Sequence, residues 1–319
     1  MTEALLALWD GAFGSSYAIW SATLVRSAPL LWLGLGVALA FRAGVLNIGA
    51  EGQFLMGAIG ATAMAQVVGR SVPGLVMIPL MALVGGVAGA GWAGIAAWLR
   101  QRFGVLEVIS TIMLNFIALA TIGWMVRGPL QEPTRIYPQS AEIPWSAQWP
   151  FLIPGQRLHL GFVLGLLACA IAWVVLTRTA TGFRIRAVGA SPSAATSAGQ
   201  IDVGRTVMRV FLVSGACAGL AGAAEVGGVT WALYEGISPG YGYTAIAVAL
   251  LARLHPGWIV VSAIFFGALE AGASAMQRDA GVPSVVVQVI VAVIILGVLA
   301  GSQRRTRVDA LRVRAGSRR

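Results

Sequence analysis

Residues 41–58 read FRAGVLNIGAEGQFLMGA and interrupt two long apolar runs of the chain. Asn47 and Glu51 stand among glycines in this stretch, and their spacing of four residues places them on one face of the helix that begins here. Polar side chains inside apolar runs are costly in lipid and are functional candidates by default. The stretch therefore predicts a glycine-broken start of a membrane helix, with polar groups at that start.

The composition supports a membrane location for the surrounding chain. Of 319 residues, 58% are hydrophobic and only 11% are charged, and the mean hydropathy is +0.82. These values exclude most soluble enzymes, disordered chains and coiled coils, and two cysteines are too few for a disulfide scaffold. We therefore expect an all-α polytopic membrane protein.

The number of spans follows from the length of the apolar runs. A spanning helix needs about 20 apolar residues. By that measure we expect about nine spans in a single transmembrane domain, residues 1–319, at 18–41, 48–68, 74–98, 105–126, 158–176, 207–225, 241–254, 257–275 and 283–300.

The arginines predict the orientation, because cytoplasmic segments of membrane proteins carry an excess of positive charge. Arginines crowd into alternate connections and into the last segment, where seven follow Gly301. We expect a cytoplasmic loop at 177–206, a cytoplasmic arginine-rich tail at 301–319, an extracytoplasmic loop at 127–157 and an amino end on the outside. The net charge of +10 is thus explained by topology and does not indicate a nucleic-acid partner.

The residue types also limit the chemistry. All 22 basic residues are arginine, so no phosphate-binding or catalytic lysine exists in this chain. His159 and His255 lie at the margins of spans without other ligands at metal-binding spacing, and Cys169 and Cys217 lie in apolar runs. We expect no catalytic residues, no metal site and no cofactor bound by this chain. Any nucleotide chemistry would therefore belong to a partner.

The order of segments predicts two halves related as an inverted repeat. A second glycine-rich start, GISPGYGY at 236–243, follows the span at 207–225 much as residues 45–53 follow the span at 18–41, but from the opposite side. Such interrupted helices mark substrate paths in transporters. Three Gly-x-x-x-Gly pairs, beginning at Gly85, Gly161 and Gly215, predict close helix packing and no other role.

Two sets of residues are candidates for function. Asn47, Glu51, Asn115 and Glu270 are polar residues in spans, and the alternative is that they cap helix ends or tie helices together. The segment 191–199 predicts a short helix, with Ser191 as N-cap, Pro192 first, Ala194 and Ala195 inside and Gly199 at the end. A helix this short is marginal alone, so we expect it to dock onto a cytoplasmic protein; the alternative is a solvated loop.

Residues 41–58 strongly resemble the permeases of bacterial nucleoside ABC importers, within the wider family that serves ribose and branched-chain amino acids. Residues 182–199 and the SGACAGLAG at 214–222 are similar to that family's coupling segment. The resemblance covers about residues 20–300. Family members usually have ten spanning helices, with one more in front of the segment that matches residues 5–20.

The resemblance implies a bacterial inner-membrane importer subunit with no enzyme activity of its own. Its partners would be a cytoplasmic ATPase, a second permease, for which a paralogue is favoured, and an extracytoplasmic binding lipoprotein, with lipid around the spans. Coupling would use Gly189, Ser191, Pro192, Ala194, Ala195 and Gly199. A nucleoside path would use Asn47, Glu51, Phe54, Asn115, Phe116, Trp231, Tyr243 and Glu270. The alternatives are a permease for a sugar or a branched-chain amino acid, a stand-alone secondary transporter or channel, and a membrane enzyme.

Overall fold

The computed structural model describes residues 2–69, 72–199 and 201–283, together with Val285, Val286, Val289, Val293 and Gly297. The ninth expected span, 283–300, lies outside the described residues except at Pro283 and those five positions. The tail at 301–319 lies outside them entirely.

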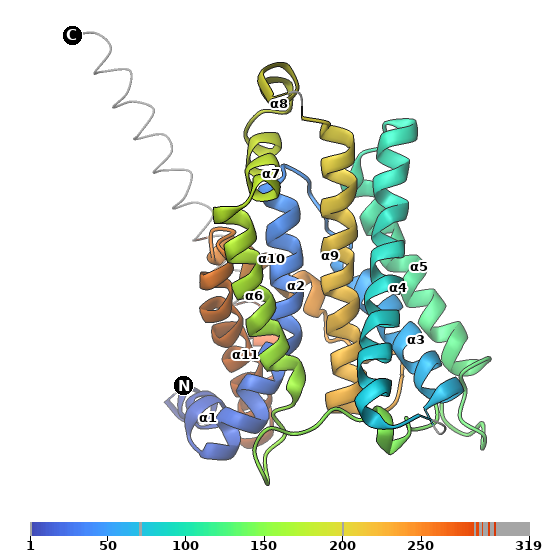
Figure 1. The fold of residues 1–319 in the computed structure, drawn as a ribbon. Coiled ribbons are helices and arrows are strands. Elements are labelled where there is room, and N and C mark those ends of the chain that lie inside the picture. Colours follow the sequence, from blue (N-terminus) through green and yellow to red (C-terminus); the bar gives the residue numbers. More distant parts are fainter. Residues whose placement is uncertain are drawn as a thin grey trace.

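The described chain is a bundle of helices (Figure 1). Its β pairings, within the same residues, are isolated bridges such as that between Gln131 and Ser140. The helices are α1 (Thr2–Phe13), a π-helical turn (Ala18–Thr23), α2 (Leu24–Arg42), α3 (Ala50–Val68), α4 (Gly74–Phe103), α5 (Glu107–Arg127), a 3-10 turn (Trp145–Ala147), α6 (Leu160–Arg178), α7 (Ala180–Ala190), α8 (Pro192–Gly199), α9 (Val203–Glu225), a second π-helical turn (Val226–Thr230), α10 (Tyr241–Leu251) and α11 (Pro256–Asp279).

The lengths of these helices confirm an all-α polytopic membrane protein. Among the described residues, six helical segments are long and apolar enough to cross a membrane: Ala18–Arg42, Gly74–Phe103, Glu107–Arg127, Leu160–Arg178, Val203–Thr230 and Pro256–Asp279. The expected spans at 48–68 and 241–254 correspond to α3, with 19 residues, and α10, with 11. An α-helix rises about 1.5 Å per residue, so α10 extends only about 17 Å and cannot cross the hydrocarbon core alone.

The two ends of the bundle differ in what they carry. At one end, α8 projects beyond the ends of the spans, and α7 lies just below it (Figure 1). Gly189 of α7 lies against the backbone of Arg42 at the end of α2. We call this end, with Arg42, Arg100, Arg184, Arg205 and Arg209, the arginine-rich end. At the opposite end lie α1 and the 127–157 loop (Figure 1).

The 127–157 loop is ordered by its own hydrogen bonds. The Thr134 hydroxyl donates to Glu132 Oε1 at 2.8 Å and the Tyr137 N–H donates to the same oxygen at 3.0 Å. These donors hold the pKa of Glu132 below its usual value. The loop also contacts the helical bundle: the backbone N–H of Trp149 donates a hydrogen bond to the Gly227 carbonyl oxygen at 2.9 Å.

The structure contains two helices that the sequence does not predict. The first is α1, whose 12 residues are too few for a criterion of about 20; it packs through Gly11 and Leu8 onto Ala275 and Gly272 of α11. The second is α7, in a segment expected to hold only one short helix. Its N-cap is Thr179, whose Oγ1 accepts a hydrogen bond from the Gly182 N–H at 3.2 Å.

The glycine pairs pack helices together, as expected. Gly85 and Gly89 of α4 lie against Gly215 and Gly219 of α9, with backbone directly on backbone. The third pair, on α6, meets α2: Trp32 Nε1 donates to the carbonyl oxygen of Gly161 at 3.0 Å. Small residues at these positions allow helix axes to approach closely in lipid.

Candidate functional site

The two broken helix starts meet inside the bundle. α3 begins at Ala50 after the chain leaves the arginine-rich end, and α10 begins at Tyr241 after the chain leaves the opposite end. The Gly242 N–H donates a hydrogen bond to Glu51 Oε2 at 2.7 Å. Both helices therefore direct the positive ends of their dipoles toward the Glu51 carboxyl group, which is only 3% exposed.

Asn47 ties the start of α3 to α9. Its Nδ2 donates to Ser214 Oγ at 2.9 Å and to Gln53 Oε1 at 3.0 Å. Its Oδ1 accepts from Gln53 Nε2 at 2.9 Å and from the Gly49 N–H at 3.0 Å. All of these side chains are buried. The Asn47 side chain thus provides a partner for the backbone N–H of Gly49, just before α3, and joins this segment to α9.

Asn115 of α5 also binds backbone groups at the start of α3. Its Oδ1 accepts from the Gly52 N–H at 2.9 Å, and its Nδ2 donates to the Ile48 carbonyl oxygen at 3.0 Å. Its Nδ2 also lies 3.4 Å from Tyr243 Oη on α10. One buried amide thus joins α3, α5 and α10.

The expected path residues divide into two groups. Asn47, Glu51, Asn115 and Tyr243 come together around the helix starts, and Phe54 is fully buried beside them, with its ring 6.1 Å from that of Tyr241. In this conformation the buried members tie helices together, which was the alternative interpretation. Their role in transport stays a prediction.

The other three expected path residues lie outside this buried cluster. Phe116 is 59% exposed on the outer face of α5. Trp231 lies at the opposite end of the bundle, where its backbone carbonyl accepts from the Ile143 N–H. Glu270 lies on α11 beside α2; its carbonyl accepts from the Ser274 hydroxyl, which in turn accepts from Arg26.

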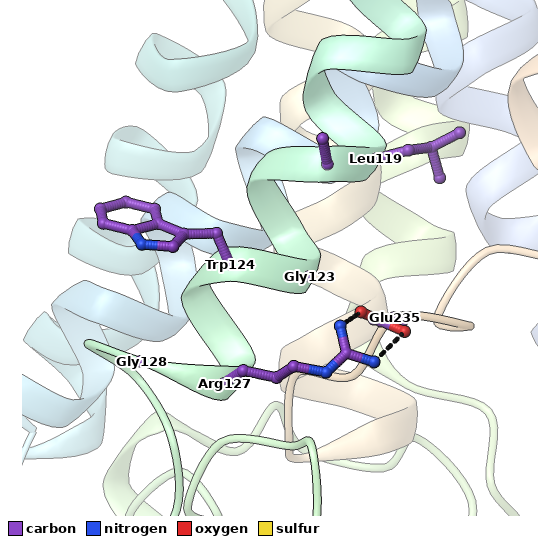
Figure 2. Close-up of a pocket in the computed structure, with 7 residues that line it drawn as sticks. Leu119, Gly123, Trp124, Arg127, Gly128 and Glu235 are labelled. Carbon is purple, nitrogen blue, oxygen red and sulfur yellow. Dashed lines mark hydrogen bonds and ion pairs between the residues drawn. The ribbon is translucent and has the colours of Figure 1, made fainter.

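An exposed surface adjoins the two helix starts. Leu119, Gly123, Trp124 and Arg127 lie along α5 and border a cavity of about 400 Å³ (Figure 2). Glu235, from the segment between α9 and α10, forms an ion pair with Arg127 there. Phe116, Leu119, Gly123 and Arg127 share one helix face by their spacing. We call Phe116, Leu119, Gly123, Arg127, Glu235 and Tyr243 the α5–α10 wall.

The short helix expected at 191–199 is present as α8. Ser191 caps it, since its Oγ accepts from the Ala194 N–H at 3.3 Å. Ala194 is exposed, whereas Ala195 is only 6% exposed. The α8 face that carries Ala194 is therefore free within the described chain, and the face that carries Ala195 is packed.

Comparison with known proteins places the chain in a family. Residues 19–299 match the family described as the permease component of branched-chain amino acid transport systems. The chain belongs to this permease family. The match covers every helix of the site, so the buried ties and the α5–α10 wall belong to the permease domain itself.

Individual relatives cover most of the permease. A guanosine ABC transporter permease of Bacillus subtilis is 39% identical over 91% of this chain and 83% of its own length. A nucleoside ABC transporter permease of Lactococcus lactis is 34% identical over 90% and 80%. A glucose ABC transporter permease of Haloferax volcanii is 40% identical over 86% and 74%.

Several permease residues at the site were not expected from the sequence. Ser214 binds Asn47, and Gly242 binds Glu51, but a serine or a glycine in an apolar run carries no signal for a specific partner. Arg127 and Glu235 are 108 positions apart, and only the fold pairs them. The glycine-rich start at 236–243 does indicate that Gly242 lies in an interrupted helix, but it does not indicate the hydrogen bond to Glu51.

Proposed function

We propose that this permease is the transmembrane subunit of an ATP-driven importer that moves nucleosides across the bacterial inner membrane. The observation that carries the proposal is the similarity, along about nine tenths of the chain, to permeases named for guanosine and for nucleosides. The partners would be a cytoplasmic ATPase, a second permease and an extracytoplasmic binding lipoprotein. ATP and magnesium would bind to the ATPase.

The α5–α10 wall is the surface that we assign to the transport path. It exposes a phenyl ring at Phe116 and a phenol at Tyr243, which can contact the flat face of a nucleobase. Asn115 and Glu51 stand directly behind it, at the starts of two interrupted helices. Transport paths follow such interruptions, because the freed backbone and helix ends can meet polar substrate groups. The second permease would supply the facing surface.

Reconstitution tests this function. The permease is incorporated into vesicles with its ATPase, second permease and binding lipoprotein, and uptake of labelled guanosine, uridine and glucose is measured with and without ATP. We expect ATP-dependent uptake of both nucleosides that excess unlabelled glucose does not reduce. Uptake of glucose but of neither nucleoside would contradict a nucleoside substrate and indicate a sugar, the substrate class of the Haloferax relative. Nucleoside uptake without ATP would refute an ATP-driven importer.

We expect α8 to dock onto the ATPase, and the exposure of its residues gives a sharp test. Ala194→Asp places a charge on the exposed face near the helix N-terminus, where a carboxylate does not oppose the helix dipole. An unpaired charge in a docked interface costs several kcal/mol. Co-purification of the ATPase should therefore fall at least roughly tenfold, while the permease stays folded.

The matched control is Ala180→Asp, which adds the same charge to an exposed first-turn position of α7 at the same end of the bundle. It should leave the ATPase bound. Ala195→Asp should instead destabilise the permease, because Ala195 is buried. Equal retention of the ATPase by Ala194→Asp and Ala180→Asp would contradict docking through α8.

A further inference from the structure

A second cavity, of about 380 Å³, lies away from the α5–α10 wall, between α2, α6, α7 and α9. Its floor includes Leu35 and Cys217, which are 2% and 7% exposed. Its sides include Ile171 of α6 and Val213 of α9, which are 55% and 49% exposed. We call it the α6–α9 groove. The groove thus leads from the outer, lipid-facing surface of the spans into an apolar interior.

The groove ends in positive charge. Arg184 of α7 and Arg209 of α9 line it, and both are exposed. They come from different helices at the arginine-rich end, and the hydroxyl-bearing residues Thr181 and Thr206 line the same region. Among the residues that the structure describes, neither guanidinium forms an ion pair with a carboxylate. The two cations are therefore available to an external anion.

The shape of the groove distinguishes between possible occupants. An α-helix is about 10–12 Å across with its side chains, so a volume of about 380 Å³ holds less than one helical turn. A free phosphate would use the arginines but would leave the apolar floor and sides empty. A phospholipid matches both parts, because it joins an apolar chain to an anionic phosphate. Basic pockets between spanning helices are typical binding sites for anionic headgroups.

We propose that the α6–α9 groove binds an anionic phospholipid, with one acyl chain against Leu35, Ile171 and Val213 and its phosphate between Arg184 and Arg209. The lipid would contact α7 through Arg184 and Ile185, directly before α8 in the chain. An occupied groove would hold α7 against α2 and α9. The site is independent of the transported substrate.

Lipid retention by the purified full chain tests the charged end of the groove. Native mass spectrometry compares bound phosphatidylglycerol with phosphatidylcholine of the same acyl chains. We expect a preference for phosphatidylglycerol that Arg184→Gln/Arg209→Gln lowers roughly 25-fold, since each arginine near an anionic surface contributes about fivefold. Arg184→Lys/Arg209→Lys should retain most of it. Arg178→Gln/Arg205→Gln removes two charges that do not line the groove and should change little.

The apolar part has its own matched pair of variants. Ile171→Trp fills the groove from its open side, whereas Leu167→Trp, one turn earlier on α6 and 54% exposed, does not line it. Ile171→Trp should release the retained lipid, and Leu167→Trp should not. Two results would show a phosphate site without a bound acyl chain. In the first, Arg184→Gln/Arg209→Gln loses the retained lipid but Ile171→Trp does not. In the second, excess inorganic phosphate displaces the lipid. Unchanged lipid preference in the glutamine double variant would overturn the proposal altogether.

Discussion

Gly242→Ala should strongly destabilise the permease. A Cβ atom built on Gly242 lies 2.5 Å from Glu51 Cα and 2.8 Å from Glu51 Cβ, and closer still to the Glu51 backbone nitrogen. These are mostly backbone atoms of a buried helix start, so relief requires α3 and α10 to separate. Separation also breaks the hydrogen bond from the Gly242 N–H to Glu51. We expect a loss of about 3 kcal/mol or more in stability.

The measurement is the yield of monodisperse protein after extraction from membranes, together with its thermal midpoint. The matched control is Gly236→Ala in the same connecting segment, where a Cβ meets nothing closer than the Tyr234 ring at 3.9 Å. Gly236→Ala should resemble the unchanged protein. A Gly242→Ala protein of normal yield and midpoint would show that the two helix starts do not touch.

The second large effect is expected at the contact between α4 and α9. Gly219→Val adds a branched side chain where a Cβ alone already lies 2.9 Å from the Gly85 carbonyl carbon and 3.1 Å from Gly89 Cα. Because the neighbours are backbone atoms, the helices must move apart, and the destabilisation should again be about 3 kcal/mol or more. Thermal unfolding of the purified permease in detergent measures it.

The control at this contact is Gly91→Val on α4, where a Cβ would meet nothing within 4 Å. Valine has a slightly better helix propensity than glycine, so Gly91→Val should be neutral or mildly stabilising. If Gly219→Val and Gly91→Val shift the midpoint equally, helix propensity and not the backbone contact controls these positions.

The apolar runs predicted most of the helices because a spanning segment must satisfy its backbone internally and face lipid. That constraint acts locally, so the spans could be found without knowing their neighbours. It says nothing of segments shorter than a span, which is why α1 and α7 were missed. The N-cap of α8 was predicted for a similar local reason, since Ser191 and Pro192 act within one helical turn.

The candidate site was only half predictable. Asn47 and Glu51 were recognised because polar groups in apolar runs are unusual, and their burial agrees with that. Their partners Ser214 and Gly242 are 167 and 191 positions away. No local pattern encodes such a pairing, and a glycine that accommodates another helix looks like any other glycine.

The sequence by itself determined a lysine-free, apolar chain of membrane helices, two glycine-rich helix starts and a capped short helix, because each of these depends on composition or on neighbours within a few residues. Only the tertiary structure decided that the two starts meet through Glu51 and Gly242, that Trp231 and Glu270 lie apart from them, and that Arg184 and Arg209 close one apolar groove. These arrangements depend on which helices pack together, and that packing is set by contacts between residues far apart in the chain.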